Sequence, residues 1–256
     1  MAAGEIGDVP VWWRRGSTGL AEVPHLRFSG SRGRLPHSGR TSVTAQTWWY
    51  GWLHGWSVML GSIIFRLRPT GRRRVPLRGG VIIACTHQSF LDPVLVGLGL
   101  PRQMSYLARR SLFPHSRALA WLMRSLNAIP VRRSGRDVEA FRESVRRLRA
   151  GAALLMFPEG TRTADGEIGR LRPGVWNIAH RARVPIVPAA IDGAFEAWPR
   201  TRRLPRPYPV RVMYGRPISV AEIDAAGSGG LNAILTERLR DLLRRCRAVR
   251  SAVGDW

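Results

Sequence analysis

Residues 82–93 read IIACTHQSFLDP, and the order of apolar and polar residues in this stretch decides the fold class that we predict. The apolar start is typical of a buried β-strand, His87 stands where that strand stops, and Asp92-Pro93 favours the start of a helix. A carboxylate has two oxygens, so Asp92 can cap the helix with one and bind a ring nitrogen of His87 with the other. The second ring nitrogen then stays basic and can take a proton from an alcohol. Taken alone, the pair is equally compatible with a loop histidine beside a capping aspartate.

Buried strands and helices alternate along the chain after this stretch. The pattern predicts strands at 81–85, 104–108, 128–131, 152–157, 185–191 and 210–214, and helices at 93–100, 116–126, 173–183 and 231–246, with a further helix that stops at Gly151. This order predicts an α/β fold, with a mostly parallel sheet flanked by helices, over residues 69–250. Ligands of such sheets gather at the carboxyl ends of the strands, so we expect the functional site there.

Two segments outside this domain are predicted in the N-terminal part of the chain. Residues 1–44 mix Gly, Ser, Arg and Pro without periodicity, which predicts a disordered basic tail. Residues 45–68 are predicted to form a membrane-associating hydrophobic helix, because residues 41–65 carry no charge and tryptophans recur at helical spacing. An apolar helix of about 18 residues is about 27 Å long, which is short for a full crossing. We therefore expect a helix embedded in one leaflet, with a full span and a core helix of the domain as alternatives.

Charge is the most unusual feature of the composition. The net charge is +24, and all 41 basic residues are arginine, since the chain has no lysine. Such a surplus indicates a polyanionic partner: a nucleic acid, an anionic lipid surface or a phosphorylated substrate. A nucleic-acid-binding protein is disfavoured, because the aromatic residues gather in the uncharged segment instead of alternating with arginines. The arginines that follow this segment, from Arg66 to Arg78, suit an anionic membrane surface on the cytoplasmic side.

Two more predicted strands end in charged residues. The strand at 128–131 is followed by Arg132 and Arg133, and the strand at 152–157 by a loop that contains Glu159, Gly160, Thr161 and Arg162. The planar fork of arginine binds phosphate with two hydrogen bonds, and Glu159 can hold the fork of Arg162 in place. The glycine suits a turn with positive φ.

The two cysteines show no spacing typical of metal ligands, so no metal site is predicted. Cys85 lies two residues before His87 and is a conceivable nucleophile. We interpret it as a small buried residue instead, because the interior of a strand raises the pKa of a thiol.

Four blocks of the sequence, taken in order, resemble the motifs of the glycerolipid acyltransferases. Residues 86–92 (THQSFLD) are similar to the family's Asn-His-x4-Asp block, and residues 157–162 (FPEGTR) match its most diagnostic block. Residues 129–133 and 184–188 resemble the second and fourth blocks. The members that the chain resembles most are the 1-acylglycerol-3-phosphate acyltransferases. Thr86 stands where asparagine is usual and Asn127 where glycine is usual, and these departures bear on the choice of acceptor.

The resemblance implies that a fatty acyl group passes from acyl-CoA or acyl carrier protein to the free hydroxyl of a lysophospholipid. The implied acceptor is 1-acylglycerol-3-phosphate, which gives phosphatidic acid in phospholipid biosynthesis. His87 would be the general base, Asp92 would orient it, and the loop at 159–162 together with Arg133 would bind the acceptor, with the phosphate held by Arg162 and Arg133. The co-substrate is the acyl thioester, and no further cofactor is implied.

Alternative functions remain open at this point. Glycerol-3-phosphate or another lysolipid could be the acceptor. A hydrolase that uses His87 and Asp92 is a weaker alternative, because the chain has no Gly-x-Ser-x-Gly elbow. We expect the enzyme at the cytoplasmic face of the cell membrane.

Overall fold

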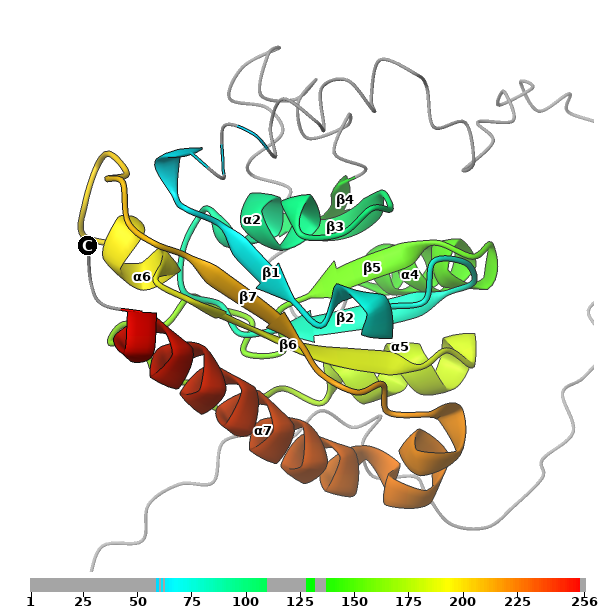
Figure 1. Cartoon of the computed structure of the whole chain (residues 1–256). Helices are drawn as coiled ribbons and strands as arrows, with labels where there is room; N and C mark the ends of the chain where they lie inside the picture. The colour runs from blue at the N-terminus through cyan, green and yellow to red at the C-terminus, as the bar shows by residue number, and fades with distance from the viewer. Residues whose placement is uncertain (1–58, 60, 62, 110–127, 132–136, 254–256) are drawn as a thin grey trace, which may run out of the picture. The chain divides into compact units, whose positions relative to one another are not determined.

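The computed structural model describes residues 59, 61, 63–109, 128–131 and 137–253, and within them a seven-stranded sheet has the order β1-β7-β6-β2-β5-β3-β4 (Figure 1). The strands are β1 (Arg68–Thr70), β2 (Val81–Cys85), β3 (Met104–Arg109), β4 (Ala128–Val131), β5 (Ala153–Met156), β6 (Ile186–Asp192) and β7 (Arg211–Tyr214). The pair of β6 and β7 is antiparallel, and every other neighbouring pair is parallel. The prediction of an α/β fold with a mostly parallel sheet is therefore confirmed.

The central strand β2 is buried on both faces of the sheet. Val81, Ile83 and Cys85 point into one apolar cluster, and Ile82 and Ala84 point into the other. All five residues are fully buried. A strand that has a core on each side needs apolar residues at every position, which explains the uninterrupted apolar run in the sequence.

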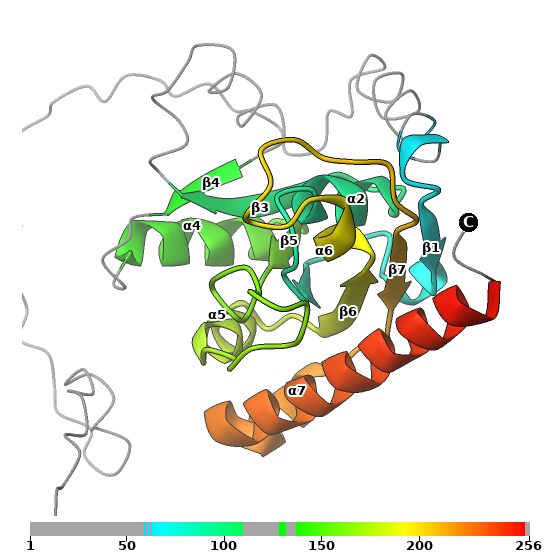
Figure 2. The same cartoon turned by 90° about the vertical axis from the view of Figure 1, so that its left-hand side faces the viewer.

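Helices cover both faces of this sheet (Figure 2). One cluster packs the sheet against α4 (Val138–Arg149), α5 (Gly174–Ala182) and α7 (Val220–Val253). The other packs it against α2 (Asp92–Leu98) and the short helix α6 (Ala194–Ala197). A 3-10 turn, η2 (Arg72–Arg74), follows the edge strand β1. With helices on both faces of the described sheet, we expect a ligand at the ends of the strands.

Three short elements were not predicted: β1, η2 and α6. They contain three or four residues each and have no apolar period of their own. The first of them follows the predicted hydrophobic helix directly, because Leu67 is buried in the core and Arg68 begins β1. The amide of Val210 also donates to the carbonyl of Phe65 over 2.8 Å. The end of the segment at 45–68 therefore packs with the sheet.

Several predicted segments lie outside the described residues: the tail at 1–44, most of the segment at 45–68 and the helix at 116–126. None of the helices in the described part of the chain combines the length and the apolar character that a membrane crossing requires. The membrane-embedded helix therefore stays a prediction.

Candidate active site

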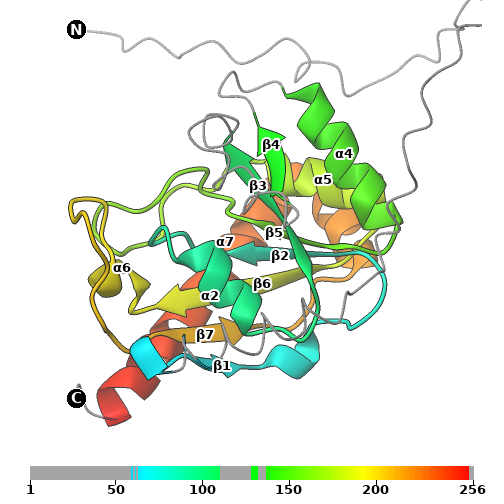
Figure 3. The same ribbon diagram turned by 90° about the horizontal axis from the view of Figure 1, so that it is seen from above.

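The loops that follow β2, β5 and β6 meet at one edge of the sheet (Figure 3). β2 lies between the other two strands, and all three run in the same direction, with Ala84 opposite Met156 and Cys85 opposite Ala189. Parallel neighbours place their carboxyl ends at a common edge, as the sequence predicted for the loops at 86–92 and 157–162. Residues that are about 70 positions apart in the chain thus become neighbours, since the amide of His87 donates to Glu159 Oε1 over 2.8 Å.

His87 and Asp92 are in contact within the first of these loops. His87 Nδ1 lies 2.8 Å from Asp92 Oδ2, and the exposed fractions of the two side chains are 18% and 0%. The same oxygen accepts from the amides of Gln88 (2.6 Å) and Ser89 (2.8 Å). An ionised carboxylate only accepts hydrogen bonds, so Nδ1 carries the proton and the lone pair of the imidazole is on Nε2. Among the described residues, none forms a hydrogen bond with Nε2.

The surroundings of this imidazole restrict how it can move. Its ring stacks on Phe157, the first residue after β5, with centroids 3.9 Å apart and an interplanar angle of 16°. The hydrogen bond to Asp92 at the edge of the imidazole and the phenyl ring on its face leave the side chain of His87 little freedom to rotate. The basic nitrogen of His87 is therefore held in a defined direction before any substrate binds.

The prediction that Asp92 caps α2 is wrong. The helix begins at Asp92 itself, and Leu91 occupies the capping position without any side-chain hydrogen bond to the helix amides. A carboxylate at the first helical position lies beside the preceding loop. Asp92 Oδ2 therefore accepts hydrogen bonds from the amides of that loop and not from those of the helix. Asp92 Oδ1 is buried and has no hydrogen-bond partner among the described residues. The aspartate therefore holds the histidine and its loop, not the helix.

The electrostatic state of Asp92 reflects this position. Burial raises the pKa of the carboxyl group, and the hydrogen bonds from His87 and from the amides of Ser89 and Gln88 oppose that shift. These donors favour the charged form, which is the form that can stabilise a protonated imidazole.

Glu159 joins the two loops, and its contacts differ from those predicted. Oε1 accepts from the amide of His87, and Oε2 accepts from the amide of Gly169 over 3.0 Å. Thr163 adds a second link, because its amide donates to the carbonyl of His87 over 2.8 Å. The predicted hydrogen bond in which Arg162 donates to Glu159 does not occur among the contacts of the described residues, and the carboxylate oxygens accept from these backbone amides instead. The side chain is 5% exposed, and burial raises its pKa, against the effect of the amides of Gly169 and His87. Glu159 thus fixes the backbone of His87.

Gly160 and Thr161 shape the turn that follows. Gly160 has a φ of 70°, and its amide donates to the carbonyl of Phe157 over 3.0 Å. A Cβ at this position would lie 2.8 Å from Nε of Arg172. The interpretation of Gly160 as a turn residue with positive φ is therefore confirmed. Thr161 is exposed and lies at the side of a hollow beside this turn.

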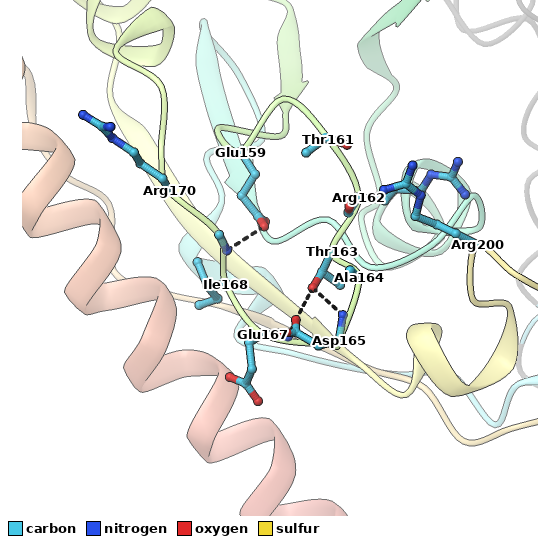
Figure 4. Close-up of a pocket in the computed structure, with 11 residues that line it drawn as sticks. Glu159, Thr161, Arg162, Thr163, Ala164, Asp165, Glu167, Ile168, Arg170 and Arg200 are labelled. Carbon is cyan, nitrogen blue, oxygen red and sulfur yellow. Dashed lines mark hydrogen bonds between the residues drawn. The ribbon is translucent and has the colours of Figure 1, made fainter. Parts of the chain in front are cut away.

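This hollow has a volume of about 330 Å³ and is shown in Figure 4. Three arginines line it: Arg162, Arg170 and Arg200. The guanidinium of Arg162 lies over the ring of Phe90, with Cζ 3.4 Å from the ring centroid, in a cation–π arrangement. This contact fixes the plane of the guanidinium at the side of the hollow toward the His87 loop.

The acidic residues of the hollow are bound within the protein. Glu159 accepts from two amides, Asp165 Oδ1 accepts from the hydroxyl of Thr163 over 2.8 Å, and Glu167 pairs with Arg247 over 2.7 Å. Of these three acids, Glu167 alone is paired with an arginine, so the hollow combines three arginines, which can donate to an anion, with the carboxylates of Glu159 and Asp165. His87 does not line the hollow, so an anion bound there would be held beside the base and not against it.

Some residues that support the site were not predicted. Ser89 Oγ donates to the carbonyl of Trp198 over 2.9 Å, and a guanidinium nitrogen of Arg200 lies 3.5 Å from the carbonyl of Arg162. Trp198 and Arg200 both lie in the loop after α6. The sequence pattern did not place this loop at the edge of the sheet where the site lies. The only signal available was a cluster of arginines from 200 to 206. Arg133 lies outside the described residues, so its predicted role stays a prediction.

Cys85 is fully buried, and burial raises its pKa well above the usual value. This confirms that it is a small core residue and not a thiolate nucleophile. Within the described ranges, no group of three or more His, Cys, Asp or Glu side chains is arranged to hold a metal ion.

Comparison with known proteins agrees with this geometry. Residues 66–192, which include both loops, match the model of the Acyltransferase family. The chain belongs to this family. The chain is 28% identical over 174 residues to the 1-acyl-sn-glycerol-3-phosphate acyltransferase of Bacillus subtilis, and the match covers 68% of this chain and 84% of that protein.

Other acyltransferases match over a smaller share of their length. A chloroplastic 1-acyl-sn-glycerol-3-phosphate acyltransferase of Brassica napus is 27% identical over 146 residues, or 56% of this chain, but the match spans only 42% of that relative. The fold is similar to the crystal structure of the 1-acyl-sn-glycerophosphate (LPA) acyltransferase PlsC from Thermotoga maritima. The TM-score is 0.65 at 23% identity, and the match covers 77% of this chain and 82% of that one.

Proposed function

We propose that this acyltransferase moves a fatty acyl group from a thioester to the free hydroxyl of 1-acylglycerol-3-phosphate. The observation that carries the proposal is the His87–Asp92 pair at the carboxyl edge of the sheet, beside a hollow lined by arginines. This combination provides a base for an alcohol and a binding place for a phosphate. The named relatives, which are acyltransferases of 1-acyl-sn-glycerol-3-phosphate, support the same acceptor.

The reaction follows from the direction of the imidazole. Nε2 of His87 takes the hydroxyl proton while the acceptor oxygen forms a bond to the thioester carbonyl carbon. The charge of Asp92 stabilises the imidazolium that results, because Oδ2 lies 2.8 Å from Nδ1. The carbon–sulfur bond then breaks, the carbonyl forms again, and Nε2 returns the proton to the thiolate. The products are phosphatidic acid and a free thiol, and no acyl-enzyme is formed.

The phosphate of the acceptor would bind in the hollow. Arg162 is held with its plane fixed over Phe90, so its fork is preorganised for two hydrogen bonds to phosphate oxygens. Thr161 can add a hydroxyl donor from the same loop. Arg133, in the part of the chain that is not described, is proposed as a second phosphate ligand, as the family resemblance implies.

The domain organisation that we propose has three parts. Residues 1–44 are a basic tail, residues 45–68 associate with one leaflet of the cytoplasmic face of the membrane, and residues 69–250 form the catalytic domain. The exposed arginines of η2, from Arg72 to Arg74, support contact with an anionic lipid surface just after the apolar segment. Because Leu67 is buried in the core and Arg68 begins β1, a deletion that tests the segment should stop at residue 58. Loss of membrane binding with unchanged activity on a short-chain acceptor is expected.

The experiment that tests the reaction uses purified protein and labelled acyl-CoA or acyl carrier protein with a panel of acceptors. We expect phosphatidic acid from 1-acylglycerol-3-phosphate, with slower or no product from glycerol-3-phosphate and lysophosphatidylcholine. Preference for one of these would assign a different acceptor. Release of free fatty acid that no acceptor accelerates would indicate a hydrolase instead. His87→Ala is the control for a contaminating activity.

A further inference from the structure

The loop at 198–207, which joins α6 to β7 and which we call the arginine loop, is unusually basic. It contains Arg200, Arg202, Arg203 and Arg206, and no acidic residue occurs between positions 197 and 221. Three prolines, at 199, 205 and 207, lie among these arginines. Figure 2 shows the loop as a long arc between the two elements that it connects.

Hydrogen bonds inside the arginine loop hold its shape. The amide of Arg206 donates to the carbonyl of Ala197 over 2.9 Å, which closes the base of the arc. Trp198 Nε1 donates to the carbonyl of Arg202 over 3.0 Å, and the amide of Arg202 donates to the carbonyl of Pro199 over 3.2 Å. Together with the prolines, these bonds reduce the conformational entropy that the loop would lose on binding a partner.

The arginine loop lies directly beside the candidate active site. Ser89, two residues after the catalytic histidine, donates to the carbonyl of Trp198. The ring of Trp198 also contacts that of Phe90, with centroids 5.5 Å apart. Any surface that binds the loop therefore also faces the entrance to His87.

The tip of the arginine loop has charged and apolar groups without partners in the protein. The side chains of Arg202 and Arg203 are exposed, and no described residue forms a hydrogen bond or ion pair with either guanidinium. Leu204, next to them, is 74% exposed, the highest value among the large apolar side chains of the described residues. Phe90 and Val94 on the neighbouring α2 side are also exposed, at 53% and 42%.

We propose that the arginine loop is a docking surface for anionic lipid headgroups, with Arg202 and Arg203 in the headgroup layer and Leu204 at its apolar boundary. This inference rests on the proposed function, because an acceptor that resides in a membrane has to reach His87 from that membrane. Each arginine close to an anionic bilayer strengthens binding roughly fivefold. The loop would thus seat the active-site edge on the bilayer and shorten the path of the acceptor to the base.

The combination of groups favours lipid over an acidic protein or a nucleic acid. A leucine at the tip of a basic loop, with a phenylalanine and a valine nearby, matches a surface that is anionic outside and apolar below. A carrier protein or the phosphates of coenzyme A would use the arginines but would have no use for an exposed leucine. These donors are therefore alternative outcomes of the test.

The first test places a fluorescent reporter on the loop of the full-length protein. Cys85 and Cys246 are both buried, so Leu204→Cys can be labelled selectively with an environment-sensitive dye. Vesicles that contain phosphatidylglycerol should shift the emission to the blue, and vesicles of phosphatidylcholine alone should shift it much less. The matched control is a dye on Ala233→Cys, an exposed position on α7, which should not respond. No response at position 204 to either vesicle, or an equal response at 233, would overturn the proposal.

The second test uses two charge-reversal variants with the same change in net charge. Arg202→Glu with Arg203→Glu alters the loop, and Arg181→Glu with Arg240→Glu alters exposed positions on α5 and α7. We expect the loop variant to lose at least tenfold in activity on a long-chain acceptor in phosphatidylglycerol vesicles, and the control variant to lose much less. Both should keep wild-type activity on a soluble short-chain acceptor without vesicles.

The soluble assay separates the possible failures. A higher KM of the loop variant for acyl-CoA or acyl carrier protein in that assay would assign the loop to the thioester donor and overturn lipid docking. If the wild type acylates neither acceptor, the proposed function fails, whereas the dye at position 204 still reports whether the loop binds lipid. Equal losses of vesicle activity in both charge-reversal variants would show that the net charge of the protein, and not the position of the loop, causes the effect. This result would also overturn the proposal.

Discussion

The described part of the chain contains two histidine–aspartate pairs with nearly identical contact distances, and one of the two has the setting of an active site. In one pair His87 Nδ1 lies 2.8 Å from Asp92 Oδ2, and in the other His180 Nδ1 lies 2.7 Å from Asp224 Oδ1. The side chains of the first pair are 18% and 0% exposed, and those of the second are 46% and 31% exposed. The hydrogen bond itself therefore does not distinguish a base from a surface contact.

The surroundings of the two pairs do distinguish them. His87 follows the end of β2, at the edge where β5 and β6 also end. His180 lies on α5 near its end, just before the start of β6, and therefore at the opposite edge of the sheet. Asp224 is also bound by Arg183, which already neutralises its charge. No arginine of the described residues pairs with Asp92, so its charge is available to support a protonated imidazole.

The largest expected effect comes from removal of the imidazole at the first pair. His87→Ala should lower kcat by ~10²–10⁴-fold, because general-base catalysis typically contributes that much. His180→Ala is the matched control and should leave kcat within about twofold of the wild type. Initial rates with saturating thioester and acceptor measure both. Similar rates in the two variants would remove His87 from the mechanism.

Asp92→Asn should separate activity from stability. The amide can still accept the hydrogen bonds of the loop amides, but it cannot stabilise an imidazolium, so kcat should fall by ~10²-fold or more. Because burial raises the pKa of Asp92, the charged carboxylate disfavours the folded state, and this cost grows as pH rises through the raised pKa. At pH 7 we therefore expect the variant to be at least as stable as the wild type in urea denaturation. A large loss of stability would mean that the aspartate has a structural role.

Arg162 tests the hollow beside the first pair. Arg162→Lys keeps the charge but loses the planar fork and its stacking on Phe90, so the KM for lysophosphatidate should rise ~10-fold. Arg162→Ala should raise it further, with little change in the KM for the thioester. Kinetics in which each substrate is varied in turn measure the split. A rise confined to the thioester would move the arginine to the donor site.

Most of the fold could be predicted because its strands are buried on both faces. Continuous apolar runs such as the one from Val81 to Cys85 gave the observed bounds of β2, and β5 and β6 differ from the prediction by at most one residue at either end. The edge strand β1 has the sequence RPT and no such signal, and among the described strands β7 alone pairs with it. A short element at the edge of a sheet depends on tertiary contacts, which local patterns do not encode.

The candidate site was predictable where one loop contains both partners, as with His87 and Asp92. Contacts between loops were not predictable. Glu159 lies 72 positions from the His87 amide that it binds, and no sequence pattern pairs them, whereas Arg162 lies nearby in the same loop and was the partner that we predicted. The same limit applies to Ser89 and Trp198, which are 109 positions apart. The second histidine–aspartate pair, 44 positions apart, gave no signal for the same reason.

The smallest effect is expected at the second pair, and its sign with pH is opposite to that at Asp92. The hydrogen bond from His180 is the main cause that lowers the pKa of Asp224, with Arg183 adding to it. A carboxyl group with a lowered pKa stabilises the folded state above its unfolded pKa and loses this contribution as pH falls through the folded value. Asp224→Asn should therefore slightly lower the urea midpoint at pH 6, and the difference from the wild type should disappear once the pH falls below the lowered folded-state pKa. Activity should not change in this variant, because the pair lies at the far edge of the sheet. A variant that is less stable by the same amount at both pH values would show that the contact acts through packing against Trp176, which stacks on His180, and not through charge.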